Sequence, residues 1–449
     1  MLNLKEIISH KFINNSFISV VGMVISGVLG YLFHFSVSRK LPVSQYGELQ
    51  SLISILSILG LFSAAISNIV LKYSSIFAGQ NDKESNYQFF KYILKKTSIY
   101  TFFLIVAFFI CSPFIQKRME FSSIIGLFFV GFSVFIGLIC TIYQNVLAGW
   151  EKFLYVHITG AAGAGFKLLI GIIITIFYPS AAWVISSFAF SGIIAFFFYR
   201  MYVNKLYPEK KNTVVSFENL NFKYFTPDYL KKSLLPIFGF SALIVLLNSI
   251  DVLLMKYFTS SELTGYFGAY NMLGKMIFWV NGAIIAVIMP VAISESHSKG
   301  NLNLKILIGT YGFLLLTGLV ASVLYFLIPE FTIKMLFGSK YTIYSGNLWL
   351  FGIIGTLFSL LMLESNLAFA RHDFNITYLL ILVVFLEMIG IYFFHQNLFQ
   401  VGISLISSLG IGFLGSLLVN FIHRKKNIDK DLLESVSVEN MNYEGIDVK

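Results

Sequence analysis

Long apolar runs recur along almost the whole chain, and they constrain its fold more than any other feature. A helix needs about 20 mostly apolar residues to cross a bilayer, and in hydrocarbon only helices and closed barrels satisfy every backbone polar group. The runs here are continuous and lack the alternation of barrel strands. Only 12% of the residues are charged, which is too few to cover a water-soluble surface. The sequence therefore predicts an all-α integral membrane protein.

The apolar runs divide into about twelve transmembrane helices. The expected spans are 12–37, 47–71, 97–115, 121–147, 153–177, 181–201, 234–258, 263–293, 306–328, 345–370, 374–394 and 398–422. They form an N-terminal six-helix bundle at 1–201 and a C-terminal six-helix bundle at 233–422, joined by a cytoplasmic central loop at 202–232. Residues 423–449 form a polar tail of mixed charge, a composition typical of disorder. Most of the 32 Lys and Arg residues lie on one side of this arrangement, which places both termini in the cytoplasm.

An internal repeat supports the division into two halves. The segment NVLAGWEKF at 145–153 resembles NLAFARHDF at 366–374, and each joins a fourth span to a fifth. A looser pair, SRKLPVSQYGEL at 38–49 and MKYFTSSELTGYF at 255–267, has nearly the same offset. The repeat predicts two bundles related by a pseudo-two-fold axis and equally oriented, as in transporters with parallel repeats. The alternative is a chance resemblance among helices rich in Leu, Phe and Gly.

Two lysines lie deep inside predicted spans, where charge is costly and marks a functional candidate. Lys167 in the fifth span and Lys275 in the eighth are too far from the interface for a lysine stem to reach the headgroups comfortably. We expect both to face protein or a water-filled cavity and to bind an anionic substrate group such as phosphate or diphosphate. The alternative is a structural pair, for instance Lys275 with Asp251.

Polar and acidic residues inside the second half are candidates for substrate binding and ion coupling. Asn248 and Asp251 are three residues apart and would share a helix face, so they could bind substrate and a coupling cation or proton, or form a polar clasp between helices. Glu387 is a candidate proton carrier if it lines a cavity, and a buried hydrogen-bonded glutamate if it does not. Glu364 is a further ion-coupling candidate, or a residue near a helix end.

The sequence offers little support for an enzyme. It has no glycine-rich phosphate loop and no HExxH spacing, and its longest outer break, 329–344, contains a single acid, Glu330. We therefore expect no catalytic site, cofactor or metal. The basic residues are scattered singly and in pairs between apolar runs, so nucleic acid is not an expected partner.

Several segments, in their order and spacing, carry a family resemblance. They are SRKLPVSQYGELQSL, LKKSLLPIFGF, LLNSIDVLLMKYF, GYFGAYNMLGKM, the P-x-x-x-S-E segment from Pro290, and IKMLFGSKY. With these segments the chain resembles the polysaccharide and O-antigen flippases of the multidrug/oligosaccharidyl-lipid/polysaccharide exporter superfamily. The resemblance implies two bundles around a central cavity in the bacterial cytoplasmic membrane. It also places Asp251 and Lys275 on cavity-lining helices, whereas Lys167 and Glu387 lie outside that set.

The same resemblance implies a substrate and partners. The substrate would be an oligosaccharide repeat unit linked to undecaprenyl diphosphate, moved from the inner to the outer leaflet for capsule or O-antigen assembly by alternating access. Candidate partners are membrane lipids, a coupling proton or sodium ion, and a polysaccharide polymerase or chain-length machinery. The main alternative is a cation-coupled multidrug antiporter of the same superfamily, although cationic candidate residues favour an anionic substrate. A polymerase or a scaffold is a third possibility, and short outer loops argue against a polymerase.

Overall fold

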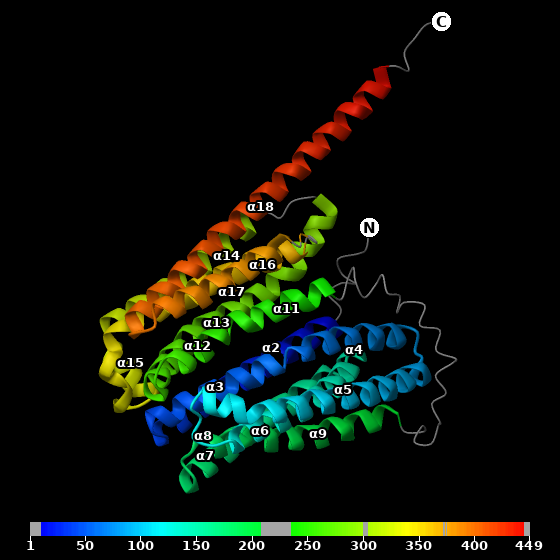
Figure 1. The fold of residues 1–449 in the computed structure, drawn as a ribbon. Coiled ribbons are helices and arrows are strands. Elements are labelled where there is room, and N and C mark those ends of the chain that lie inside the picture. Colours follow the sequence, from blue (N-terminus) through cyan, green and yellow to red (C-terminus); the bar gives the residue numbers. More distant parts are fainter. Residues whose placement is uncertain (1–9, 208–234, 300–303, 371–372, 374, 444–449) are drawn as a thin grey trace, which may run out of the picture. The chain divides into compact units, whose positions relative to one another are not determined.

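The computed structural model describes residues 10–207, 235–299, 304–370, 373 and 375–443, and these contain helices and turns but no strand (Figure 1). The helices of the first sequence half are α2 (His10–Lys40), α3 (Val43–Leu59), α4 (Phe62–Gly79), α5 (Lys83–Arg118), α6 (Ile125–Gly149), α7 (Phe153–Phe177), α8 (Ala181–Val184) and α9 (Ser186–Leu206). Those of the second half are α11 (Leu235–Leu247), α12 (Ile250–Phe258), α13 (Ser261–Lys299), α14 (Leu304–Leu327), α15 (Pro329–Leu336), the 3₁₀ segment η3 (Ser339–Asn347), α16 (Leu348–Ala370), α17 (Asn375–Phe393) and α18 (Leu398–Tyr443).

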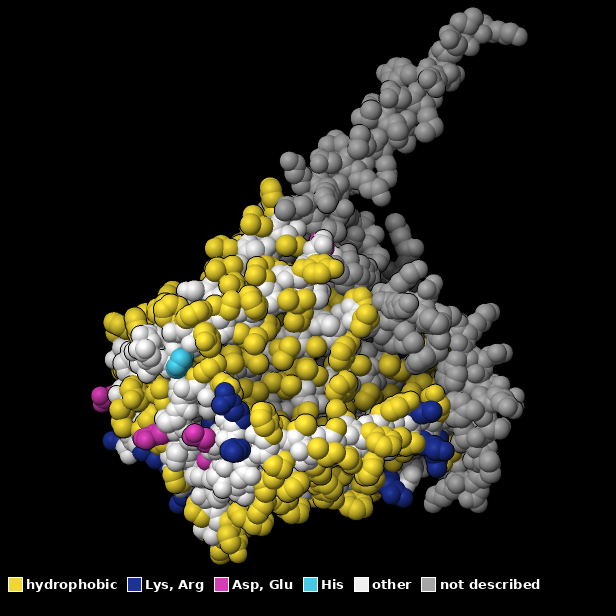
Figure 2. All heavy atoms as spheres, in the orientation of Figure 1, with side chains coloured by type: hydrophobic (Ala, Val, Ile, Leu, Met, Phe, Trp, Pro, Cys, Tyr) yellow, Lys and Arg dark blue, Asp and Glu magenta, His cyan; other side chains and the backbone are white. Residues whose placement is uncertain are grey.

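The helices match the predicted transmembrane architecture. Within the described residues, 9 helices are long and apolar enough to cross a membrane, and the total rises to 11 when two bent helix pairs are each taken as one span. The remaining predicted span falls within α13, which has 39 residues and so exceeds the length that a bilayer requires. Apolar side chains also cover much of the visible surface (Figure 2), as expected for a protein surrounded by lipid tails.

Two spans that the sequence predicts as continuous helices are bent in the structure. The first bend, of 44°, separates α3 from α4 at Gly60, and glycine is a poor helix former. The second, also of 44°, separates α11 from α12 at Asn248 and Ser249. Both of these side chains compete with the backbone for hydrogen bonds, which weakens a helix at that point.

The described residues divide into two compact units. Unit 1 comprises residues 1–271, 328–346 and 391–398, and unit 2 comprises 272–327, 347–390 and 399–449. In unit 1, α6 packs against α4, α5 and α9. Phe90 and Tyr143 meet edge to face there, with ring centroids 5.0 Å apart, a geometry that stabilises aromatic pairs. Helices α4, α5 and α9 thus pack around α6, whereas α2 packs against α7.

In unit 2, small residues bring helices close together. Gly390 of α17 lies against Ser404 of α18, and Gly412 and Gly415 of α18 lie against the side chains of Val383 and Leu379. Such contacts are the usual basis of helix association in lipid, where there is no hydrophobic force between helices.

Two predicted boundaries fall near or beyond the described residues. The central loop lies outside them from residue 208 to its end, so the bundle boundaries stay a prediction, as does the orientation of the termini. The sequence predicts a disordered tail from His423, whereas α18 continues as helix to Tyr443. Lys, Leu and Glu in this stretch are good helix formers, and extending an existing helix requires no new nucleation.

Candidate functional site

The break between α11 and α12 creates a half-helix start inside a membrane span. Asn248 and Ser249 form the turn, and their backbone amides donate to the carbonyls of Ile244 (3.1 Å) and Leu246 (3.0 Å). Asp251 follows in the first turn of α12. A carboxylate is stabilised there because the amide groups at a helix N-terminus carry partial positive charge. Broken helices of this kind form substrate and ion sites in many transporters.

Hydrogen bonds from a backbone amide and a side-chain amide hold Asp251. Its side chain is 4% exposed, and one carboxylate oxygen accepts a hydrogen bond from the backbone amide of Val252 at 2.7 Å. The other oxygen accepts from the side-chain amide of Asn271 on α13. A buried carboxyl group thereby joins α12 to α13 through the hydrogen bond from Asn271.

Asn248 does not lie on the same helix as Asp251. The sequence predicted a shared face from their spacing of three residues, but the break falls between them. Asn248 is half-buried in the turn, whereas Asp251 is buried in α12. Asn248 therefore lies in the break and Asp251 lies after it, so the predicted shared helix face is not formed.

The two turns of the internal repeat meet in unit 1 at a reciprocal glycine contact. A Cβ atom on Gly47 of α3 would lie 2.1 Å from the carbonyl oxygen of Ser261, and a Cβ on Gly265 of α13 would lie 2.1 Å from that of Val43. Val43 precedes Gly47 by four residues, as Ser261 precedes Gly265. The contact is therefore symmetric about a local two-fold axis. We call these four residues the junction.

Lysine and arginine side chains bind helix carbonyls beside the junction. Lys340 of η3 donates to the carbonyls of Arg39 (3.3 Å) and Leu41, where α2 ends. Arg39 in turn donates to the carbonyls of Leu336 (3.4 Å) and Met335 at the end of α15. These carbonyls have no partner within their own helix, and a cation at a helix C-terminus is also favoured by the helix dipole.

Two further charged residues form hydrogen bonds near the junction in unit 1. Glu48 of α3 accepts hydrogen bonds from the backbone amide (3.0 Å) and hydroxyl (2.7 Å) of Ser122. Lys256 of α12 is 3% exposed, and its ammonium donates to the carbonyl of Glu120 at 3.2 Å and to the hydroxyl of Ser261. Segments from both sequence halves are thus tied together around the junction.

Lys167 lies between aromatic rings. Its ammonium nitrogen is 5.3 Å from the ring centroid of Phe33 on α2 and 4.8 Å from that of Phe188 on α9. The two rings meet edge to face with centroids 5.6 Å apart. Within the described residues, no carboxylate forms an ion pair with this lysine, so aromatic faces provide the attraction for the ammonium.

The other three sequence candidates lie in unit 2. Lys275 is half-buried on α13. Glu364 of α16 is buried and accepts hydrogen bonds from the side-chain amide of Asn420 on α18, at its carboxylate and at its carbonyl oxygen (3.3 Å). Glu387 is buried on α17, the helix that packs against α18 through small residues. Glu364 thus lies in a hydrogen-bonded contact between two helices.

Sequence reasoning missed several residues of this region. Asn271, Glu48 and Lys256 all lie within or beside apolar stretches, and Arg39 and Lys340 lie between predicted spans. Glu48 falls inside the predicted span 47–71. Because a carboxylate within a membrane is costly, this position could have identified it as a candidate site residue. The role of Asn271 could not be seen, because an amide in a long apolar helix has no spacing that identifies its partner.

Comparisons with known proteins identify the fold. No protein-family model matches the chain, and no curated protein matches its sequence. Solved structures do match: an inward-facing multidrug resistance MATE family transporter of the MOP superfamily has a TM-score of 0.68 and 15% identity, covering 91% of this chain and 99% of that one. The MATE multidrug transporter DinF-BH has a TM-score of 0.65 and 14% identity, covering 93% and 96%.

A lipid flippase has the same fold. The lipid II flippase MurJ in an inward closed conformation matches with a TM-score of 0.68 and 14% identity, covering 96% of this chain and 94% of that one. The chain therefore has the fold of MOP-superfamily transporters. The predicted fold class, an all-α membrane protein of about twelve spans in two bundles, is confirmed.

Proposed function

We propose that the protein is a flippase that moves oligosaccharide repeat units linked to undecaprenyl diphosphate from the inner to the outer leaflet of the bacterial cytoplasmic membrane. The observation that carries the proposal is Lys167, a lysine within a membrane-spanning helix whose ammonium lies against two aromatic rings. Such a cation can attract a phosphate or diphosphate without first breaking an ion pair. The fold shared with the lipid II flippase MurJ supports the proposal.

Alternating access would proceed by opening and closing the junction. Gly47 and Gly265 let the backbones of α3 and α13 approach closely, and Lys256, Arg39 and Lys340 bind carbonyls beside them. The junction would therefore act as a gate on one side of the substrate path.

Ion coupling would act through Asp251. A coupling ion changes a conformational equilibrium only if it binds one conformation better than the other. Protonation of Asp251, or a sodium ion on its carboxylate, would weaken the hydrogen bond from Asn271 and loosen α12 from α13. Glu364 and Glu387 are further candidates, and Lys275 and Asn248 would contribute to substrate binding.

Reconstituted flipping tests the proposal. The full-length protein in proteoliposomes should move undecaprenyl-diphosphate-linked sugar across the bilayer, and Lys167→Ala and Lys275→Ala should lower the rate. Asp251→Asn should remove the dependence on a proton or sodium gradient. Lys152→Ala, an exposed lysine next to α7, is the matched control and should flip at the parent rate. Unchanged flipping in Asp251→Asn, Lys167→Ala and Lys275→Ala would show that the proposed site is wrong.

A multidrug antiporter remains the competing function, because MATE multidrug transporters share the fold and Asp251 is a buried acid near a helix break. An antiporter of this kind would export cationic dyes from cells and, when deleted, would leave surface polysaccharide unchanged. A flippase would not export cationic dyes, and its deletion would reduce surface polysaccharide. Loss of polysaccharide on deletion, restored by the wild-type gene and not by Lys167→Ala, would decide between them.

A further inference from the structure

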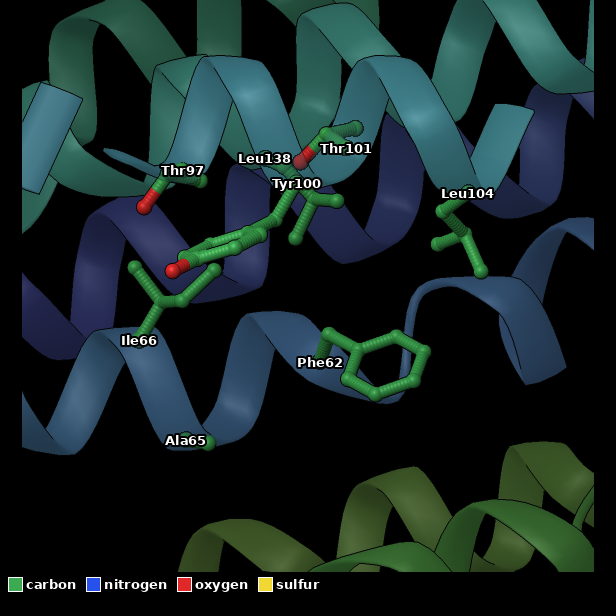
Figure 3. Close-up of a pocket in the computed structure, with 8 residues that line it drawn as sticks. All are labelled: Phe62, Ala65, Ile66, Thr97, Tyr100, Thr101, Leu104 and Leu138. Atoms are coloured by element: carbon green, nitrogen blue, oxygen red, sulfur yellow. The ribbon is translucent and has the colours of Figure 1, made fainter. Parts of the chain in front are cut away.

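A groove with a volume of about 330 Å³ opens between α4, α5 and α6 of unit 1 (Figure 3). Phe62, Ala65 and Ile66 of α4 form one wall, and Leu104 of α5 and Leu138 of α6 contribute further apolar surface. The volume lies within the range of small-molecule sites, roughly 300–1,000 Å³. None of the lining residues belongs to the candidate transport site.

The groove is apolar, with hydroxyl groups of Thr97 and Tyr100 toward one end (Figure 3). Thr97 and the hydroxyl of Tyr100 lie at the end away from Leu104, and the Tyr100 ring lies between α4 and α5 (Figure 3). Tyr100 is 66% exposed, so the groove opens at the surface of the helices. The Phe62 side chain also lies at this surface, where it is 45% exposed. Phe62 also stacks on Phe238 of α11 with ring centroids 6.0 Å apart, and the groove is open beside this pair.

The polar end lies at the depth of the lipid headgroups. Residues 97–116 of α5 carry no charge and are flanked by Lys96 and Lys117. At 1.5 Å per residue these twenty residues span about 30 Å, the thickness of the bilayer hydrocarbon. Lys96 thus lies at one interface, and Leu104, eight residues along, lies about 12 Å deeper. The groove runs from the headgroup level into the acyl-chain region.

The charges around the polar end favour an anion. Lys96 precedes Thr97 directly, and Lys72 lies on α4 six residues beyond Ile66, about 9 Å further toward the α4–α5 turn. Both lysines are exposed, and the Lys96 ammonium, which lies 5.9 Å from the ring centroid of Tyr92, would turn toward the groove to meet an anion. The three helices of the groove carry a single acidic residue, Glu84, which lies in the first turn of α5 and accepts a hydrogen bond from Gln88.

We propose that this groove binds one acyl chain of an anionic phospholipid, with its phosphate beside Lys96 and Lys72. The hydroxyls of Thr97 and Tyr100 lie at the level of the ester groups, and the hydrocarbon chain passes Ala65 and fills the end between Phe62 and Leu104 (Figure 3). The order of charge, hydroxyl and apolar wall along the groove matches the order of phosphate, ester and chain in such a lipid. The site is independent of the proposed transport function.

Native mass spectrometry of the purified full-length protein tests the site. Phosphatidylglycerol should bind more tightly than phosphatidylcholine with the same chains. A lysine near the membrane surface contributes about 1 kcal/mol toward an anionic lipid, so Lys96→Gln should weaken phosphatidylglycerol binding about fivefold and leave phosphatidylcholine binding unchanged. Ala65→Phe should block the groove and abolish tight binding of both lipids, and Ala65→Leu serves if the larger side chain prevents folding.

Two control variants lie on the same helix. Lys95 is exposed but lies on the opposite side of α5 from the groove by helical geometry, so Lys95→Gln should bind as the parent does. Ala107→Phe adds the same bulk at an exposed position outside the groove and should also have no effect. The proposal would be overturned if Lys95→Gln and Lys96→Gln weakened phosphatidylglycerol binding equally. It would also be overturned if both Ala65 variants bound the lipids as tightly as the parent protein. Tighter binding of undecaprenyl phosphate than of phosphatidylglycerol would overturn the assignment to a phospholipid.

Discussion

The substitution Gly265→Ala tests the junction directly, because the added methyl group meets backbone and no flexible side chain can move aside. Its Cβ would lie 2.1 Å from the carbonyl oxygen of Val43, whereas real Cβ atoms essentially never approach closer than 3.0 Å. The helices α3 and α13 must therefore separate by about 1 Å at this point. The substitution should disfavour the closed junction.

The size of the effect follows from the packing. Forcing an extra methyl group into a filled contact costs about 1–3 kcal/mol. Alanine also favours helix over glycine, but α13 is helical whether the junction is closed or open, so that gain cancels between the two states. A cost of this size shifts the equilibrium toward opening by roughly 5- to 150-fold.

Cysteine labelling measures this shift. Thr264 is buried beside the junction, so Thr264→Cys in a protein without Cys111 and Cys140 should react with a maleimide mainly when the junction opens. Adding Gly265→Ala should raise the labelling rate by about the factor that the equilibrium shifts, roughly 5- to 150-fold. Gly30→Ala is the matched control, since a Cβ on Gly30 would meet nothing within 4 Å.

The reciprocal geometry gives a second check. Gly47→Ala should produce an effect similar to that of Gly265→Ala, because each Cβ would meet a carbonyl on the opposite helix at the same distance. In the double variant, the change in free energy of junction opening should be smaller than the sum of the two single changes, because the first substitution already separates the helices. If Gly265→Ala were folded and labelled at the rate of the Gly30→Ala control, the junction would not be a closed contact that transport must open.

Three other experiments test individual contacts. Asn271→Ala removes a donor from the buried carboxylate of Asp251 and should lower the free energy of unfolding by about 1.5–3 kcal/mol; a change below about 0.5 kcal/mol in denaturation in detergent would contradict that bond. A double-mutant cycle of Glu364→Ala and Asn420→Ala should give a coupling energy of about 0.5–3 kcal/mol, and additive effects would show that this contact does not join α16 to α18. Lys167→Met keeps an unbranched side chain and loses only the attraction to the rings, about 0.5–2 kcal/mol, so thermal unfolding should change little while flipping falls.

Much of the fold could be predicted from the sequence, because hydropathy records how long each apolar run is and a bilayer requires a fixed length. The repeat was also informative: Gly47 and Gly265, which meet in the structure, lie in the two segments whose similarity is weakest. The bend at Asn248 and Ser249 was not visible, since two polar residues hardly change the mean hydropathy of a long apolar run.

The partners of the candidate site were beyond sequence reasoning for a different reason. Asp251 stood out because a carboxylate inside a span is rare, but its partner Asn271 is an ordinary polar residue on the next helix. Lys167 was expected to face protein or water, and the rings of Phe33 and Phe188 are two among 48 phenylalanines. Abundant residue types give no statistical signal of a specific contact, so only coordinates reveal such partners.

The close approach of α3 and α13 also bears on how easily the molecule could cycle. The cost of parting two helices rises with the apolar surface that becomes exposed to water, and a glycine carries no side chain to expose. Parting the helices at Gly47 and Gly265 therefore forfeits only contact attraction and a few hydrogen bonds. A junction of this kind can be closely packed when it is closed and still open and close many times under thermal motion and a modest ion gradient.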